Sequence, residues 1–247
     1  MQSVEMALDA ALIVIQNGGS TIAANRSFNN ILKGYKKEGV SATWRLDFIS
    51  ATTADEGRSA TIVRSVGPIG VNLVRASEIQ ILGEKVAAGE LNTISIADEI
   101  ERIKKLHTPY NRWLAVLAAA CIGAAMSQFA GGDTGSFGIA FIAAGIGQIL
   151  RSILQARKLP VANITLICAF ISACIACYGI KMRYSESIPI TLIASVVYLA
   201  PGLPLINGFL DMISHKFLFI GMERMSNALF LFLVMAITIV LAHTLIL

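Results

Sequence analysis

The chain has 247 residues, of which 55% are hydrophobic and 15% are charged, and its mean hydropathy is +0.67. Soluble domains average about 25% charged residues, so this composition argues against an ordinary cytosolic enzyme. The net charge of +4 is small and no long run of basic residues occurs, which excludes a typical nucleic-acid-binding protein.

The charges are concentrated in the first part of the chain. Residues 1–112 hold 25 of the 36 Asp, Glu, Lys and Arg residues, whereas residues 113–247 hold only 11. This asymmetry predicts a cytoplasmic domain over 1–112 followed by a transmembrane domain over 113–247. The first twenty residues carry Glu5 and Asp9 and no basic start, so we expect no signal peptide and a cytoplasmic N-terminus.

The N-terminal domain is expected to be α+β. Helix starts and stops come from capping residues and glycines, and strands come from alternating side chains. The pattern predicts, in chain order, a helix over 4–16, a helix from a Ser20 cap to about Glu38, strands over 41–53 and 59–66 joined by the Asp55-Glu56-Gly57 turn, and helices over 72–88 and 95–107.

The residue inventory of this domain argues against catalysis. His107 is the only histidine of the domain, and the domain has no cysteine. The residues for a catalytic nucleophile–base pair are therefore almost entirely absent from it. No phosphate-binding loop, dinucleotide motif or metal-ligand spacing occurs, and we expect no catalytic residue, metal or cofactor. Arginines such as Arg64 and Arg75 could contact an anion, although a solvated face is the simpler interpretation. Regulation, gating or assembly is the expected role.

Five apolar stretches are long enough to cross a bilayer, which takes about 20 residues in a helix. They lie at 113–130, 135–154, 161–180, 188–210 and 225–247. Nine Lys and Arg residues flank one side of these spans and two flank the other, which predicts a cytoplasmic N-terminus and an outside C-terminus. An odd number of spans is unusual for a complete transporter, because internal repeats normally double the count. The chain could therefore be half of a larger assembly.

The fourth span carries the most specific feature, two prolines with a glycine between them. Pro201 and Pro204 lack the N–H groups that would pair four residues back, so the helix must break near Gly202. The helix that restarts presents free N–H groups suited to a carboxylate. Asn207 and Asp211 are four residues apart and share a face of it. This is the pattern of a discontinuous transporter helix, and a proline kink with a packing role is the alternative that the residues leave open.

Candidate site residues follow from these positions. Pro201, Gly202, Pro204 and Asn207 are candidates for substrate binding. Asp211 is the main candidate for proton coupling or gating, because a carboxylate at membrane depth is functional by default, and Asp133 in the first outer loop is a weaker one. Candidates for lining the pathway are Gln148, Arg151, Ser195 and Tyr198.

The string Pro201-Gly-Leu-Pro204-Leu-Ile-Asn207 followed by Asp211 resembles the signature of the threonine/serine exporter family. The Pro68-x-Gly70-Val-Asn72 stretch and the Gly131-Gly132-Asp133 loop also fit that family. The resemblance covers essentially the whole chain. It implies an inner-membrane secondary exporter of small polar amino acids, threonine and serine, driven by ion gradients. The five-helix membrane domain with a broken fourth helix, expected from the apolar stretches, agrees with one half of such a protein.

Some members of the family fuse two membrane halves, and others are split into a larger subunit and a smaller membrane partner. This chain has one half, so the resemblance implies the larger subunit of a two-component hetero-oligomer. Two alternatives stay open. A split exporter could carry a small dicarboxylate such as succinate, because a helix end that receives a carboxylate does not select threonine. The chain could also be an assembly or sensory subunit that carries no substrate.

Overall fold

The computed structural model describes residues 1–55, 58–91, 95–107 and 110–247. Its contacts divide the chain into two compact units. The N-terminal unit comprises Met1–Thr108 with Gly202–Asn227, and the helical unit comprises Pro109–Pro201 with Ala228–Leu247. These units do not coincide with the predicted cytoplasmic domain and transmembrane domain. The predicted domains describe placement relative to a membrane, and that placement stays a prediction.

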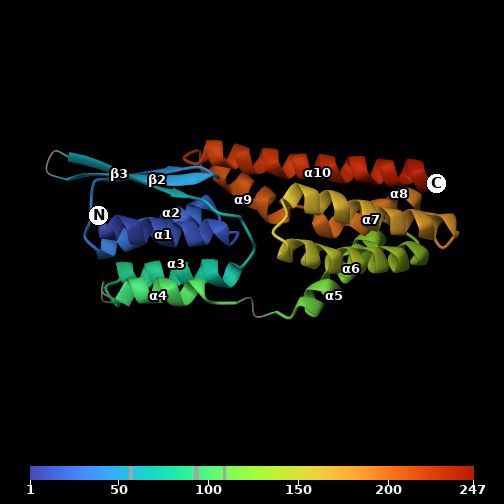
Figure 1. The fold of residues 1–247 in the computed structure, drawn as a ribbon, viewed down its shortest axis with the longest axis horizontal. Helices are drawn as coiled ribbons and strands as arrows, with labels where there is room; N and C mark the ends of the chain where they lie inside the picture. The colour runs from blue at the N-terminus through green and yellow to red at the C-terminus, as the bar shows by residue number, and fades with distance from the viewer. Residues whose placement is uncertain (56–57, 92–94, 108–109) are drawn as a thin grey trace. The chain divides into compact units, whose positions relative to one another are not determined.

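The N-terminal unit contains helices and a small sheet. The helices are α1 (Gln2–Gln16), α2 (Thr21–Gly34), α3 (Leu73–Ala87) and α4 (Ile96–Lys104), joined late in the chain by α9 (Gly202–Ile213) and the start of α10 (Leu218–Ile246). The antiparallel sheet has the order β1-β2-β3, formed by Val40–Trp44, Phe48–Asp55 and Arg58–Ser65 (Figure 1). The unit is thus α+β within the residues described.

The four predicted N-terminal helices are confirmed, but α2 and α4 both end earlier than predicted, α4 at Lys104 rather than near residue 107. The Ser20 side chain accepts a hydrogen bond from the Ala23 N–H and caps α2 as expected, but α2 ends at Gly34 rather than near Glu38. Lys36 adopts a φ of 52°, a left-handed conformation that cannot continue a helix.

The predicted single strand over 41–53 is wrong, because the chain forms two antiparallel strands there. A tight turn lies between them, closed by a hydrogen bond of 3.0 Å from the Arg45 N–H to the Phe48 carbonyl, and Trp44 pairs with Ile49. The turn contains no glycine or proline, so no residue type in the sequence marks the end of the alternating strand pattern there. The predicted second strand is confirmed as β3, and the turn at 56–57 lies outside the described residues.

The late segment of the chain completes the core of the N-terminal unit. Phe217 and Ile220 are buried in the same cluster as the apolar faces of α1, α2 and α3. The Trp44 ring packs edge-on against Phe28 at 5.9 Å between centroids and against Phe217 at 6.3 Å. Aromatic pairs in this geometry add stabilisation beyond their buried area. Residues separated by nearly the whole sequence therefore share one core.

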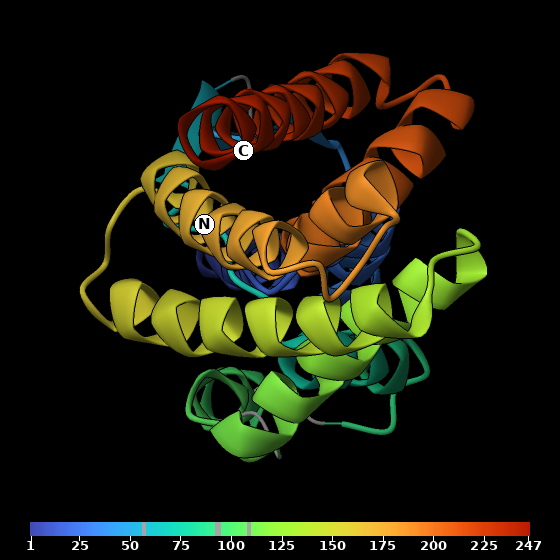
Figure 2. The same cartoon turned by 90° about the vertical axis from the view of Figure 1, so that its right-hand side faces the viewer.

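The helical unit is built from long apolar helices. It contains α5 (Arg112–Phe129), α6 (Thr134–Ala156), α7 (Val161–Lys181), α8 (Ile188–Val196), the short 3₁₀ helix η2 (Val197–Leu199) and the remainder of α10. Figure 2 shows α5 crossing α6 at an angle. Small residues allow the approach: a Cβ added at Gly123 of α5 would lie 3.0 Å from the Ala140 carbonyl of α6.

Among the described residues, four helices are long and apolar enough to cross a membrane. The number becomes five if Ile188–Leu199 and Gly202–Ile213, bent by 72° at their break, count as one span. The first three predicted spans are confirmed as helices, whereas the predicted last span over 225–247 begins seven residues earlier, at Leu218. The charged Glu223 and Arg224, predicted to lie in a loop, are therefore in the first turns of α10.

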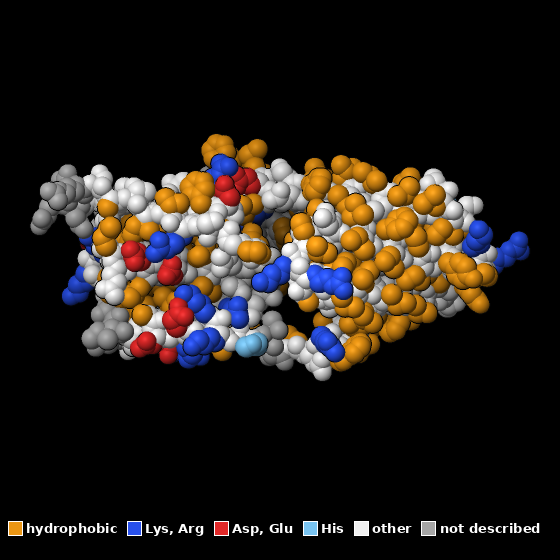
Figure 3. Space-filling view, viewed as in Figure 1, with side chains coloured by type: hydrophobic (Ala, Val, Ile, Leu, Met, Phe, Trp, Pro, Cys, Tyr) orange, Lys and Arg blue, Asp and Glu red, His pale blue; other side chains and the backbone are white. Residues whose placement is uncertain are grey.

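The surface of the helical unit is largely apolar, as expected of a membrane protein. Figure 3 shows hydrophobic side chains covering the visible face of this unit, and charged side chains gathered on the N-terminal unit. Large side chains such as Phe137, Ile193 and Phe230 are exposed on it. Apolar patches of this extent do not face water in stable soluble proteins, so the protein is a membrane protein with helical spans.

Candidate functional site

The helix break predicted at the proline pair is present. α8 tightens into η2, where the Ala200 N–H bonds the Val197 carbonyl at 2.9 Å, and α9 begins at Gly202. The Val197 carbonyl, which loses its helical partner to Pro201, is thus satisfied by a shorter turn. A Cβ added at Gly202 would touch nothing within 4 Å, so packing does not require that glycine.

The Asn207 side chain is held by the segment that follows α1 in the N-terminal unit. Its side chain is 7% exposed, and its Nδ2 donates to the Gly18 carbonyl over 2.9 Å. Gly18 has a φ of +89°, a conformation that glycine adopts readily as the stop of a helix. The glycine that follows the end of α1 therefore presents its carbonyl to α9.

Asp211 lies one turn further along α9 and is fully buried. Its Oδ2 accepts a hydrogen bond of 2.7 Å from the Thr21 hydroxyl, at the first residue of α2. The free N–H groups and the dipole at a helix N-terminus favour an anion. The second carboxylate oxygen, Oδ1, has no hydrogen-bond partner among the described residues.

The counter-charge is Arg224, in the second turn of α10 and 4% exposed. Its Nε lies 3.2 Å from Oδ2 of Asp211, close enough for an ion pair but not aligned as a hydrogen bond. Its Nη2 donates to the Gly19 carbonyl over 3.4 Å. A buried charge without a partner costs several kcal/mol, so these groups hold one another in place. We call Gly18, Gly19, Thr21, Asn207, Asp211 and Arg224 the Asp211 cluster.

Helix periodicity correctly predicts that Asn207 and Asp211 share one face of α9. It does not predict the contact of Asp211 with Arg224, which was expected only to contribute to the orientation of the spans. The glycines offer one sequence signal for this ion pair. Gly208 precedes Asp211 by three residues and Gly221 precedes Arg224 by three residues, so both pairs are separated by the same 13 residues. A Cβ at Gly221 would lie 2.8 Å from the Gly208 carbonyl, so α9 and α10 cross at these glycines and the charged pair meets one turn away.

A second polar group lies within the helical unit. Tyr198 of η2 is 8% exposed, and its hydroxyl bonds Ser172 of α7 over 3.2 Å. Ser172 also donates to the Ala143 carbonyl over 3.1 Å, and Arg151 of α6 donates from Nη1 to the Tyr198 carbonyl over 3.4 Å. The break thus brings a carbonyl to a half-buried arginine. We call Gly147, Arg151, Ser172 and Tyr198 the Tyr198 cluster.

In the described part of the chain, the other two candidates for lining the pathway have hydrogen bonds only within their own helices. Ser195 is fully buried, and its hydroxyl donates to the Thr191 carbonyl one turn back on its own helix over 2.7 Å. Gln148 is half-buried on α6, where its backbone carbonyl accepts from the Ser152 hydroxyl. Neither side chain contributes to the Tyr198 cluster through a hydrogen bond among the described residues.

Asp133 forms a third group, at the start of α6. Its carboxylate accepts from the Ser136 N–H at 2.6 Å, the Glu186 N–H at 2.7 Å and the Ser185 hydroxyl at 2.8 Å. These donors, the Ser136 N–H first, lower the pKa of Asp133 from 3.8 to about 2. It caps α6 and ties the α7–α8 loop to it, and it stays ionised near neutral pH, which favours a structural role over proton coupling.

The structure assembles the predicted residues into separate groups rather than one site. Asn207 and Asp211 join the N-terminal unit with Gly202 and Pro204, while Arg151, Tyr198 and Pro201 belong to the helical unit. No group of three or more potential metal ligands is found among the residues that the structure describes.

Comparison with known proteins identifies relatives along almost the full length. A family model described as "Putative threonine/serine exporter" matches residues 5–246. A Klebsiella aerogenes protein named "Probable succinate transporter subunit YjjP" is 26% identical, over 97% of this chain and 92% of that protein. The Escherichia coli K12 protein of the same name is 24% identical, over 97% and 93%. No solved structure matches the chain.

A third relative is much longer than this chain. The Mycobacterium tuberculosis protein named "Probable threonine/serine exporter" is 21% identical over 92% of this chain, but the match covers only 43% of that protein. The region in common therefore corresponds to less than half of a larger exporter in that organism.

The Tyr198 cluster yields a packing prediction. A Cβ at Gly147 would collide with the Tyr198 hydroxyl and the Ser172 Oγ, whereas one at Gly138 on the same helix would meet nothing. Overpacking costs about 1–3 kcal/mol, so Gly147→Ala should lower the melting temperature of the purified protein in detergent. Gly138→Ala, the matched control, should leave it unchanged or slightly higher. Equal melting temperatures for the two variants would contradict the close packing.

The Asp133 cap yields a pH prediction. Because the folded pKa lies below the ordinary 3.8, ionised Asp133 stabilises the fold fully above about pH 4, and this contribution is lost as the pH falls toward 2. Asp133→Asn should lower the melting temperature at pH 7, and its difference from wild type should shrink as the pH falls below 4. Glu186→Gln, which keeps the backbone N–H, is the control. A difference that does not vary with pH would exclude this linkage.

Proposed function

The chain belongs to the threonine/serine exporter family, and from this premise we propose that it is the larger subunit of a two-subunit secondary exporter in the bacterial inner membrane. The substrate is a small carboxylate, and the smaller subunit is a second membrane protein of the same family. The observation that carries the proposal is the broken fourth segment, whose restarted helix α9 holds Asp211 in a buried ion pair with Arg224.

The two-subunit assembly is supported by the relatives' names and by the share of each relative that this chain covers. The two relatives named as transporter subunits match this chain over 92% and 93% of their own length. The relative named as an exporter without the word subunit is more than twice as long as its matched region. With at most five spans among its described residues, the chain has the size of one membrane half.

Two substrate classes deserve direct comparison. Succinate is the first candidate, because both relatives of matching length are named succinate transporter subunits. Threonine and serine are the second, because the family model and the longer relative carry those names. All three molecules carry a carboxylate, which a helix N-terminus or an arginine can bind.

We place the N-terminus and the domain 1–112 in the cytoplasm and the C-terminus outside. Nine basic residues beside one set of span ends, against two beside the other, support this orientation. The Asp211 cluster then lies toward the cytoplasmic end of the pathway, because α9 follows the helix break and packs with α2 in the N-terminal unit. In this position the cluster can gate entry from the cytoplasm.

The gating chemistry follows from the contacts of Asp211. In the closed state its charge is shared between Thr21 and Arg224. Protonation of Asp211, with its unpaired Oδ1 as the accepting atom, removes the attraction to Arg224. The arginine is then free to bind the carboxylate of a substrate, for which Pro201, Gly202, Pro204 and Asn207 are the proposed binding residues. Arg151 and Tyr198 of the helical unit are proposed to line the pathway. Proton and anion are thereby coupled at one residue pair.

Counterflow in reconstituted vesicles tests the proposal. Vesicles with both subunits should exchange labelled succinate, and each subunit alone should not. Asp211→Asn, Arg224→Gln and Asn207→Ala should each slow exchange by about tenfold or more, because each removes a contact proposed to act during transport. Pro201→Ala should slow it as well, because the restored N–H can pair with the Val197 carbonyl and close the helix break. Gly138→Ala, on open surface of α6, is the control.

Two results would contradict the proposal. Full activity from the partner alone would make this chain an assembly or sensory subunit. Unchanged exchange in all four variants, at normal membrane levels, would remove the site assignment. Parallel assays with labelled threonine and serine decide the substrate class, since only the true substrate should exchange at a rate that depends on both subunits.

A further inference from the structure

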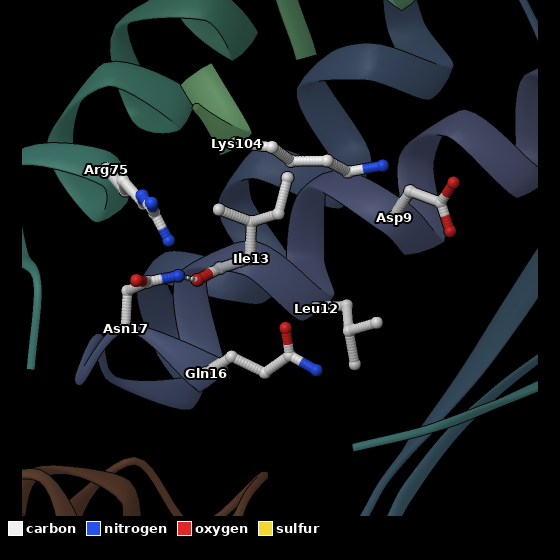
Figure 4. Close-up of a pocket in the computed structure, with 7 residues that line it drawn as sticks. All are labelled: Asp9, Leu12, Ile13, Gln16, Asn17, Arg75 and Lys104. Atoms are coloured by element: carbon white, nitrogen blue, oxygen red, sulfur yellow. Dashed lines mark hydrogen bonds between the residues drawn. The ribbon is translucent and has the colours of Figure 1, made fainter. Parts of the chain in front are cut away.

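A small cavity lies in the N-terminal unit and is lined by none of the residues of the Asp211 cluster. Its volume is about 140 Å³, and it is formed by α1, α3 and α4 (Figure 4). Arg75 of α3, Lys104 of α4 and the last two turns of α1 supply its walls. Two cations from different helices thus face one cavity in a domain that has no catalytic residue set.

Arg75 is fixed in a position to bind an anion. Its Nε donates to the Leu106 carbonyl over 2.6 Å, which orients the guanidinium plane. Among the described residues, the Nη nitrogens make no further hydrogen bond. A guanidinium held in this way can contact a carboxylate through both Nη groups.

Lys104 supplies the second charge. In Figure 4 its side chain runs over α1 toward Asp9, while Arg75 points toward Asn17, so the two cations approach from opposite ends with Ile13 between them. Lys104 pairs with Glu101 over 2.6 Å, but both side chains are exposed, and such pairs contribute little. The one acidic lining residue, Asp9, is matched by Arg64 at 3.4 Å.

Size and lining restrict the ligand. The cavity volume of about 140 Å³ is well below the roughly 300 Å³ of drug-sized sites, which favours a ligand of a few heavy atoms over a nucleotide. Leu12 and Ile13 provide an apolar middle, and Gln16 and Asn17 provide amides. A short molecule with a carboxylate at each end and methylenes between matches this arrangement.

The cavity also adjoins the Asp211 cluster along the chain. Gln16 and Asn17 are followed directly by Gly18 and Gly19, whose carbonyls accept from Asn207 and Arg224. The backbone of Gln16 and Asn17 is itself fixed by hydrogen bonds of 2.8 Å and 3.1 Å from the Gly70 and Asn72 N–H groups. A ligand that contacts the end of α1 therefore acts on the segment that positions the cluster.

We propose that this cavity is a regulatory site for a small dicarboxylate anion, and that its occupancy shifts the equilibrium of the Asp211 cluster. Arg75 and Lys104 bind the two carboxylates, and the apolar side chains of α1 contact the methylenes. The site is distinct from the transport pathway and rests on the proposed function only for its regulatory consequence. The exporter would then respond to the cytoplasmic concentration of a dicarboxylate, its own substrate included.

Hydrogen–deuterium exchange of the two-subunit complex in nanodiscs, with succinate as the probe, tests the site. At ten times the dissociation constant, succinate should slow exchange in peptides covering residues 9–17, 73–80 and 100–106 by up to about tenfold. Lys104→Gln and Arg75→Lys should abolish this protection. Lys105→Gln, which removes an adjacent charge that does not line the cavity, should retain it.

Protection that is absent in wild type, unchanged in both cavity variants, or equally produced by threonine or inorganic phosphate would overturn the site. Succinate counterflow measured on the same complexes separates the two proposals. Counterflow without protection refutes the regulatory site and leaves the exporter intact. Protection without counterflow of succinate, threonine or serine supports the site and refutes the exporter.

Discussion

The ion pair between Asp211 and Arg224 is the constraint on which the N-terminal unit depends. Both side chains are almost fully buried, and a buried charge that loses its partner costs about 3–5 kcal/mol. The pair therefore requires α9 and α10 to cross closely, which Gly208 and Gly221 permit. It also requires the α2 N-terminus to approach, because the Thr21 hydroxyl donates to Oδ2 of the carboxylate. A segment from the last fifth of the chain is in this way built into the core formed by the first hundred residues.

The helical unit is governed by a different requirement, that backbone groups at membrane depth find partners within the protein. Two prolines break the fourth segment, and the structure meets the requirement with a 3₁₀ turn and with Arg151, which donates to the Tyr198 carbonyl. Gly147 leaves the space in which Tyr198 and Ser172 bond each other. The break thus gathers polar groups inside an apolar bundle. Such groups can serve a substrate, and they also satisfy the carbonyls that a proline kink frees.

Local signals predicted much of this architecture. The length of the apolar stretches gave the spans, Ser20 and Asn72 marked helix starts, and the proline pair located the break. The turn between β1 and β2 was missed because Arg45, Leu46 and Asp47 continue the alternation of the strands. The contact of Asp211 with Thr21 was missed for a physical reason: the two residues are 190 positions apart, and helix periodicity carries no information on which distant elements meet. Asp133 illustrates the same limit, since its donors at Ser185 and Glu186 come from another loop.

A double-mutant cycle on Asp211 and Arg224 tests the central claim most directly. The free energies of unfolding of wild type, Asp211→Asn, Arg224→Gln and the double variant would be measured in one detergent. If the buried pair organises the unit, each single variant should be strongly destabilised, and the double variant should recover about 1–3 kcal/mol relative to additivity. The exposed pair Arg102–Glu78 serves as a reference and should show little coupling. Additivity at Asp211 and Arg224 to within about 0.5 kcal/mol would contradict the account.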